Sequence, residues 1–159
     1  MRTKITVIGA GNVGGTTAHR LAEKELGEEI VLLDAYAGIA RGKALDMVEA
    51  GPVCGYSTKV LGTDSFEDVK DSYITIITAG FPRRPGMTRE ELLLTNAEVV
   101  KKIVVEVVRV APETIIIMVT NPLDAMAYWQ GKRSLGREGR PRPSGSSPRF
   151  WPGRRGETS

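Results

Sequence analysis

Residues 4–34 read KITVIGAGNVGGTTAHRLAEKELGEEIVLLD and carry the clearest fold signal in the sequence. A β-rich apolar run predicts a strand over Lys4–Ile8, helical spacing predicts a helix over Val13–Glu25, and a second apolar run predicts a strand over Ile30–Asp34. Short β-rich runs that alternate with helical patterns are typical of βαβ units. The stretch therefore predicts the first such unit of a parallel sheet.

The turn between the first strand and the first helix is a G-x-G-x-x-G pattern, made of Gly9, Ala10, Gly11, Asn12, Val13 and Gly14. In a dinucleotide site the first glycine permits the tight turn, the second lets a pyrophosphate approach, and the third lets helix and strand pack closely. The helix N-terminus offers free N–H groups to the phosphates. An ordinary turn between a strand and a helix is the alternative interpretation.

Asp34 follows the last glycine of this pattern by 20 residues, at the end of the second predicted strand. There its carboxylate can accept hydrogen bonds from both hydroxyls of an adenosine ribose. The same carboxylate would repel a 2′-phosphate. The sequence therefore predicts NAD, and not NADP, as the cofactor.

The alternation of strands and helices continues to residue 128. We predict further strands over Thr58–Leu61, Tyr73–Ala79 and Thr114–Val119, and further helices over Ile39–Ala50 and Arg89–Val110. Residues 1–128 are thus expected to form a Rossmann-type, doubly wound parallel α/β sheet with five strands, which is the nucleotide-binding domain.

A loop between the fourth strand and the long helix, residues 80–89, reads GFPRRPGMTR and holds Arg83, Arg84 and Arg89. The planar fork of arginine donors matches a carboxylate, so the loop predicts a small anionic substrate with more than one carboxylate. Asn121 follows the fifth predicted strand at the same sheet edge and could bond a substrate oxygen. A solvated charged turn and a helix N-cap are the alternatives for the arginines and for Asn121.

Three segments, GAGNVG, AGFPRRPGMTREELLLTN and MVTNPLDAMAY, resemble the NAD-dependent malate dehydrogenases that are structurally close to lactate dehydrogenases. The resemblance covers residues 1 to about 128. It implies that Arg83 binds the distal carboxylate of malate or oxaloacetate and that Arg89 polarises the reacting carbonyl. In related lactate dehydrogenases a glutamine usually matches Arg83, so the arginine favours a dicarboxylic 2-oxoacid.

The same resemblance implies further contacts and properties. Asn96 would face the cofactor, Asn121 would contact the substrate, and the strand end would line the NAD site through Val119, Thr120 and Asn121. The family resemblance also implies a role in the tricarboxylic acid cycle and a homo-oligomer with the helix Ile39–Ala50 near an interface.

The chain departs from the family in its catalytic residues. Such a dehydrogenase needs an imidazole to exchange the hydroxyl proton and an aspartate to orient it. In the family, the histidine and the aspartate come from sequence after the fifth strand, together with a further arginine, the sixth strand and the substrate domain. We expect all of these to be absent here. The only histidine, His19, lies in the first predicted helix. We therefore predict NAD binding without useful turnover; the alternative is a non-catalytic NAD-binding regulatory module.

Residues 129–159 differ in composition from the rest. Within residues 131–159 there are seven Arg, six Gly, five Ser and four Pro, and Leu135 is the single aliphatic residue. Such a segment buries too little apolar surface to fold, so we expect either a disordered tail or the product of a reading frame lost near Trp129.

Charge and composition also limit the function classes. Residues 131–159 have a net charge of +6 and residues 1–130 a net charge of −3, so the basic character belongs to the tail and nucleic-acid binding is not expected. No apolar run of about 18 residues predicts a membrane span, and the first predicted strand leaves no room for a signal peptide. The lone Cys54 excludes an internal disulfide, which favours a cytoplasmic protein. No metal site is expected.

Overall fold

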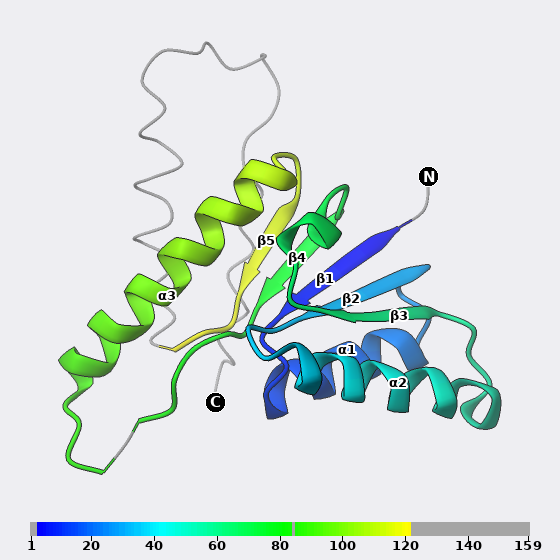
Figure 1. Cartoon of the computed structure of the whole chain (residues 1–159), viewed down its shortest axis with the longest axis horizontal. Coiled ribbons are helices and arrows are strands. Elements are labelled where there is room, and N and C mark those ends of the chain that lie inside the picture. The colour runs from blue at the N-terminus through cyan, green and yellow to red at the C-terminus, as the bar shows by residue number, and fades with distance from the viewer. Residues whose placement is uncertain (1–2, 84, 122–159) are drawn as a thin grey trace, which may run out of the picture.

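The computed structural model describes residues 3–83 and 85–121. Along the chain it contains β1 (Lys4–Ile8), α1 (Asn12–Glu23), β2 (Glu29–Leu33), α2 (Ala37–Cys54), β3 (Lys59–Thr63), the short 3-10 helix η1 (Phe66–Val69), β4 (Ile74–Ile77), α3 (Arg89–Val110) and β5 (Ile115–Met118) (Figure 1). Arg84 and the predicted tail, residues 129–159, lie outside these ranges. The sequence after the fifth strand, where the family has its sixth strand, also lies outside them. Within them, no helix has the length and apolar character needed to cross a membrane.

The described strands form one sheet in which every neighbouring pair is parallel, in the order β3-β2-β1-β4-β5. The chain therefore winds outward from β1 to β3, returns to the other side of β1, and winds outward again. Figure 1 shows α1 and α2 on one face of the sheet and α3 on the other. This arrangement confirms the predicted Rossmann-type doubly wound fold. In such sheets the reversal of winding, here between β1 and β4, leaves a crevice at the carboxyl ends of the strands.

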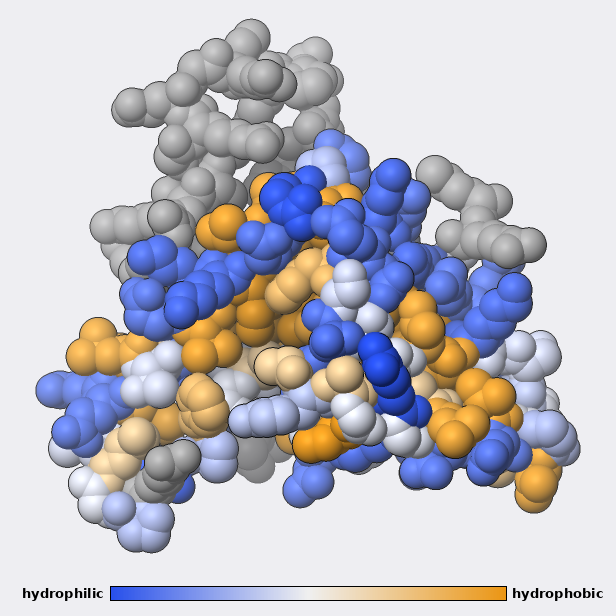
Figure 2. All heavy atoms as spheres, in the orientation of Figure 1, coloured by the Kyte–Doolittle hydropathy of each residue, from blue (hydrophilic) through white to orange (hydrophobic). Residues whose placement is uncertain are grey.

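Alternate strand residues fill two hydrophobic clusters, because side chains along a strand point to opposite faces. One cluster joins Ile5, Val7, Ile30, Leu32 and Ile76 to Ala18, Ala22, Ala40 and Met47 of α1 and α2. The other joins Ile8, Leu33 and Ile77 to Val69 of η1 and to Ile103 and Val107 of α3. Figure 2 shows the hydrophilic outer side of α3 with hydrophobic residues beneath it, toward the sheet. Both faces of the sheet are thus held, and the strand ends have fixed positions.

Most element boundaries lie within two residues of those predicted, and three elements differ from the prediction. The predicted strand Tyr73–Ala79 is the shorter β4, Ile74–Ile77, and the Thr78 N–H still donates to the Ile8 carbonyl of β1 at 2.9 Å. The predicted helix Ile39–Ala50 is longer, Ala37–Cys54, and continues through Pro52 until Gly55 adopts a left-handed conformation (φ 79°) and its N–H bonds the Gly51 carbonyl. The helix η1 was not predicted, since its four residues are too few for a periodic pattern.

Candidate dinucleotide site at the carboxyl edge of the sheet

Gly9 forms the turn at the end of β1. Its φ is +105°, which residues with a side chain rarely adopt, and its N–H donates to the Leu33 carbonyl at 2.7 Å. A Cβ at this position would lie 2.7 Å from the Ala79 nitrogen. The turn therefore passes between the ends of β2 and β4, at the crevice.

Gly14 brings α1 against this turn. A Cβ on Gly14 would lie 1.7 Å from the Gly9 carbonyl oxygen and 2.5 Å from Thr78 Oγ1. The Thr78 hydroxyl in turn donates to the carbonyls of Ile8 and Gly9, at 3.1 Å each. Helix and strand are thus as close as two backbones can come, which is the contact expected of the third glycine of the motif.

Gly11 begins α1 and faces open space. A Cβ built on Gly11 would meet no heavy atom within 4 Å, no side chain caps the helix, and its first turn holds no acidic residue. At α3, by contrast, Thr88 and Glu91 form a capping box that uses the first N–H groups of that helix. The first N–H groups of α1 therefore remain available. The open space beside them, which a side chain at Gly11 would fill, fits a pyrophosphate.

Asp34 follows β2 and contacts the glycine turn directly. Its Oδ2 accepts a hydrogen bond from the Ala10 N–H at 2.6 Å, and its Oδ1 accepts one from the Tyr36 N–H at 3.0 Å. A carboxylate can accept about four hydrogen bonds, so two positions remain for the hydroxyls of a ribose. Asp34 therefore shapes the turn and stands where a ribose beside the pyrophosphate would lie.

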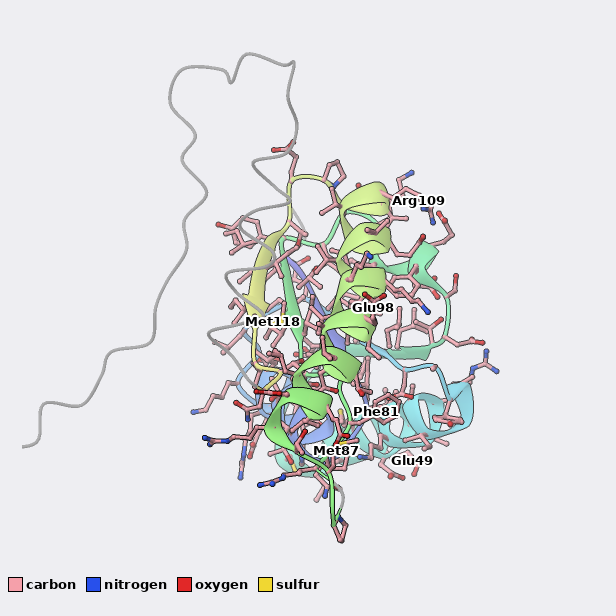
Figure 3. All side chains as sticks on the ribbon, turned by 90° about the vertical axis from the view of Figure 1, so that its left-hand side faces the viewer. Glu49, Phe81, Met87, Glu98, Arg109 and Met118 are labelled. Atoms are coloured by element: carbon pink, nitrogen blue, oxygen red, sulfur yellow. The ribbon has the colours of Figure 1, made fainter. Side chains whose placement is uncertain are left out.

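The arginine loop folds back on itself. Gly86 has a φ of +84°, and Arg83 Nε donates to the Met87 carbonyl at 2.9 Å. Figure 3 shows Phe81 and Met87 at the N-terminal end of α3, opposite Arg109. Arg89 is exposed and is the first residue of α3. A cation there is disfavoured by the helix dipole, so helix stability does not explain Arg89.

Asn96 joins the root of this loop to the end of β5. Its side chain is 2% exposed. Oδ1 accepts from the Phe81 N–H at 2.8 Å, and Nδ2 donates to the carbonyls of Asn121, at 2.9 Å, and Phe81, at 3.3 Å. Both donors of the amide are thus used within the protein, and a contact between Asn96 and the cofactor stays a prediction.

The three residues after β5 alternate in direction. Thr120 is buried, and its hydroxyl donates to the Ala79 carbonyl at 2.7 Å, so it fixes the end of β5 against that of β4. Val119 and Asn121 are exposed. The structure therefore brings Asn121 beside the root of the arginine loop, through Asn96. In the described part of the chain, it shows no hydrogen bond or ion pair between Arg83 or Arg89 and the glycine turn.

Two residues of this edge were missed by the sequence analysis. Thr78 supports the turn through the two bonds described above, and the Lys43 ammonium on α2 donates to the carbonyls of Ala10 and Gly11. Lys43 is 33 and 32 residues away from its partners along the chain, and no local pattern marks it. Thr78 could have been noticed as a hydroxyl at the carboxyl end of a central strand.

Comparison with known proteins agrees with this geometry. Residues 3–140 match the family model described as lactate/malate dehydrogenase, NAD binding domain. The chain is 56% identical over 125 residues to a malate dehydrogenase of Chlorobium phaeobacteroides (strain BS1), which covers 79% of this chain and 40% of that protein. The chain thus spans about two fifths of the length of the curated relatives it matches.

Solved structures show the same fold. The crystal structure of Cryptosporidium parvum malate dehydrogenase matches with a TM-score of 0.78 and 41% identity, over 84% of this chain and 42% of that one. A lactate dehydrogenase of the same organism, complexed with lactic acid and nicotinamide adenine dinucleotide, matches with a TM-score of 0.78 and 39% identity, over the same shares of the two chains. The chain therefore belongs to the lactate/malate dehydrogenase family, whose NAD-binding domain it contains.

Proposed function

We propose that this chain is the NAD-binding part of a malate dehydrogenase, in which malate and oxaloacetate are interconverted as NAD accepts or returns a hydride. The observation that carries the choice of substrate is Arg83. Its Nε bonds the Met87 carbonyl, which leaves the two terminal nitrogens of the guanidinium for the paired hydrogen bonds that a carboxylate accepts. The 56% identical relative from Chlorobium phaeobacteroides, named a malate dehydrogenase, supports the same choice.

Each site residue then has a proposed role. The turn from Gly9 to Gly14 binds the pyrophosphate, Asp34 binds the adenosine ribose, and Val119, Thr120 and Asn121 line the nicotinamide side with Asn96. Arg83 binds the distal carboxylate, Arg89 polarises the reacting carbonyl, and Asn121 bonds the substrate. The Asn96 bridge supports this division, because it keeps Asn121 and the root of the arginine loop in a fixed relation.

We propose that the 159-residue chain by itself binds NAD but does not turn over. His19, its only histidine, is an exposed residue of α1 that lines the groove between α1 and α2. No other described residue offers an imidazole to the substrate. General acid–base catalysis contributes about 10²–10⁴-fold, so its loss removes useful activity. In an assay of NADH oxidation by oxaloacetate, the purified chain is expected to show the rate of the protein-free control. A rate that rises in proportion to protein concentration would contradict this proposal.

A second experiment tests the role of Arg83. In the NADH complex, Arg83→Gln is expected to weaken oxaloacetate binding by about tenfold or more, since a charged hydrogen-bonded pair is lost, and to leave pyruvate binding unchanged. The measurement is the affinity for each acid, determined by calorimetry on the NADH-saturated protein. Arg109→Gln, at the other end of α3, is the matched control. Equal oxaloacetate affinity in wild type and Arg83→Gln would reject the assigned role.

A non-catalytic, NAD-binding regulatory module is the second candidate. The position of His19 favours it, since an NAD sensor needs no proton-transfer group. The arginine loop argues against it, because a protein that senses NAD alone needs no carboxylate-binding arginines. Stoichiometric NADH binding together with a stable partner protein, and no response to oxaloacetate, would favour the module.

Other proposals rest on composition and charge, or on the resemblance. Residues 1–128 form the NAD-binding domain and residues 129–159 are separate from it; the protein is cytoplasmic, binds neither a membrane nor nucleic acid, and serves the tricarboxylic acid cycle. The family resemblance also implies a homo-oligomer in which α2 lies near an interface. Exposed apolar residues on this helix, Ile39, Leu45, Val48 and Val53, support that placement.

A further inference from the structure

Lys43 contacts the glycine turn from a different element. Its ammonium nitrogen lies 2.7 Å from the Ala10 carbonyl oxygen and 3.0 Å from that of Gly11. The side chain reaches these atoms along the groove between α1 and α2. Among the ion pairs of the described residues, none includes Lys43, so its charge is not neutralised by a carboxylate.

These two hydrogen bonds show the direction of two peptide groups of the turn. In a trans peptide the C=O and the following N–H point to opposite sides. Because the carbonyls of Ala10 and Gly11 point toward Lys43, the N–H groups of Gly11 and Asn12 point away from it. The Lys43 ammonium therefore lies on the carbonyl side of both peptide groups, opposite the two N–H donors, and the Gly11 carbonyl also accepts from the Gly15 N–H at 2.9 Å.

Ala10 is held on both sides by opposite charges. Its N–H donates to Asp34 at 2.6 Å, and its carbonyl accepts from Lys43 at 2.7 Å. Ala10 is fully buried, so the two charged side chains act on a peptide with no access to water. Charged groups make stronger hydrogen bonds than neutral ones, and both charges fix one conformation of the turn.

Gly15 makes room for this lysine. A Cβ on Gly15 would lie 3.0 Å from Lys43 Nζ, 3.1 Å from Cδ and 3.5 Å from Cε, and these are the three nearest heavy atoms. The two neighbouring glycines thus have different tasks: Gly14 faces the backbone of the turn, and Gly15 faces the Lys43 side chain.

We propose that Lys43 is a positioning residue for the pyrophosphate of NAD. The absence of a side chain at Gly15 leaves the space that the Lys43 side chain needs to reach the turn. Lys43 holds the N–H groups of Gly11 and Asn12 in the direction that a phosphate requires, and its positive charge favours the anion. The inference rests on the NAD assignment and is independent of the proposed dicarboxylate substrate.

The test is the affinity of Lys43→Met for ligands with and without phosphates. NADH binding is measured by fluorescence titration, and ADP and adenosine binding by chemical-shift titration. Lys43→Met is expected to bind NADH and ADP about tenfold more weakly or worse, with adenosine affinity unchanged, because only the phosphates meet the N–H groups that Lys43 directs. Lys24→Met, which removes the same charge at the other end of α1, is expected to bind all three as the wild type does.

Gly15→Ala distinguishes an effect on the position of the Lys43 side chain from an effect on the stability of the protein. It also replaces Lys43→Met as the test variant if Lys43→Met does not fold. Alanine stabilises a helix by up to about 1 kcal/mol relative to glycine, yet its Cβ displaces the lysine. For Gly15→Ala we expect weaker NADH binding than in the wild type, at an equal or higher melting temperature. The double variant, Gly15→Ala with Lys43→Met, is expected to bind NADH as strongly as Lys43→Met alone. NADH affinity unchanged in either variant, or equal losses for NADH and adenosine, would overturn the role of Lys43. Failure of the wild type to bind NADH would contradict the cofactor assignment itself.

Discussion

Gly14→Ala is expected to abolish measurable NADH binding and to lower the free energy of unfolding by about 3 kcal/mol or more. The added Cβ would lie 1.7 Å from the Gly9 carbonyl oxygen, and no side-chain rotation can relieve a clash between two backbones. The helix α1 must then move off β1, which separates its N–H groups from the turn. Chemical denaturation measures the stability, and NADH fluorescence titration measures the binding.

Two other glycines supply the controls for this experiment. At Gly11, a Cβ would meet nothing within 4 Å and φ is −66°, so Gly11→Ala is expected to fold as the wild type does but to bind NADH more weakly, since its methyl group occupies the path of the pyrophosphate. At Gly42, in α2, a Cβ would also meet no heavy atom within 4 Å, so Gly42→Ala is expected to lower neither the free energy of unfolding nor the NADH affinity. A Gly14→Ala protein with wild-type stability would show that helix and strand need no glycine there.

Asp34→Ala is expected to remove the preference for NADH over NADPH. The substitution deletes the acceptor for the ribose hydroxyls and the charge that repels a 2′-phosphate, and it also frees the Ala10 N–H. The loss of hydrogen bonds to a charged group corresponds to about 1.5–3 kcal/mol, so NADH affinity should fall by about 10- to 100-fold. Titration of both dinucleotides against the variant gives the ratio directly.

Asp64→Ala is the matched control for Asp34→Ala. Asp64 directly follows β3, as Asp34 follows β2, but its exposed carboxylate pairs with Arg41. An exposed pair of this kind contributes about 0–1 kcal/mol, and we expect no change in the ratio of NADH to NADPH affinity. If Asp34→Ala keeps the wild-type ratio, Asp34 does not select the dinucleotide.

The fold could be predicted because its signals are local. The glycine turn lies directly between β1 and α1, and the apolar runs of Ile30–Leu33 and Ile115–Met118 are typical of parallel strands. The first run is buried as such a pattern predicts, whereas β5, at the edge of the sheet, is only partly buried. The bounds of all five strands and of α1 and α3 were predicted within two residues. The end of α2 was missed, because Gly51 and Pro52 suggest a stop that the packed helix overrides until Gly55.

The supporting contacts of the site could not be predicted, because they join segments far apart in the chain. Lys43 reaches Ala10 across 33 residues, and Asn96 reaches Asn121 across 25. The sequence names the side chains that such a site needs, but only the packing of α2 on α1, or of α3 on the sheet, decides which backbone atoms they meet. Asn96 illustrates this, since its amide is engaged by Phe81 and Asn121.

The turn Gly9–Gly14 and Asp34 together are the proposed site for NAD, and every other role assigned at this sheet edge depends on it. The dissociation constants of NADH and NADPH for the purified 159-residue chain, measured side by side at one ionic strength, test it most directly. We expect saturable, stoichiometric NADH binding and NADPH binding about tenfold weaker or worse, since a 2′-phosphate would meet the Asp34 carboxylate. NADPH binding as tight as that of NADH, or tighter, would contradict the assignment of this site to NAD.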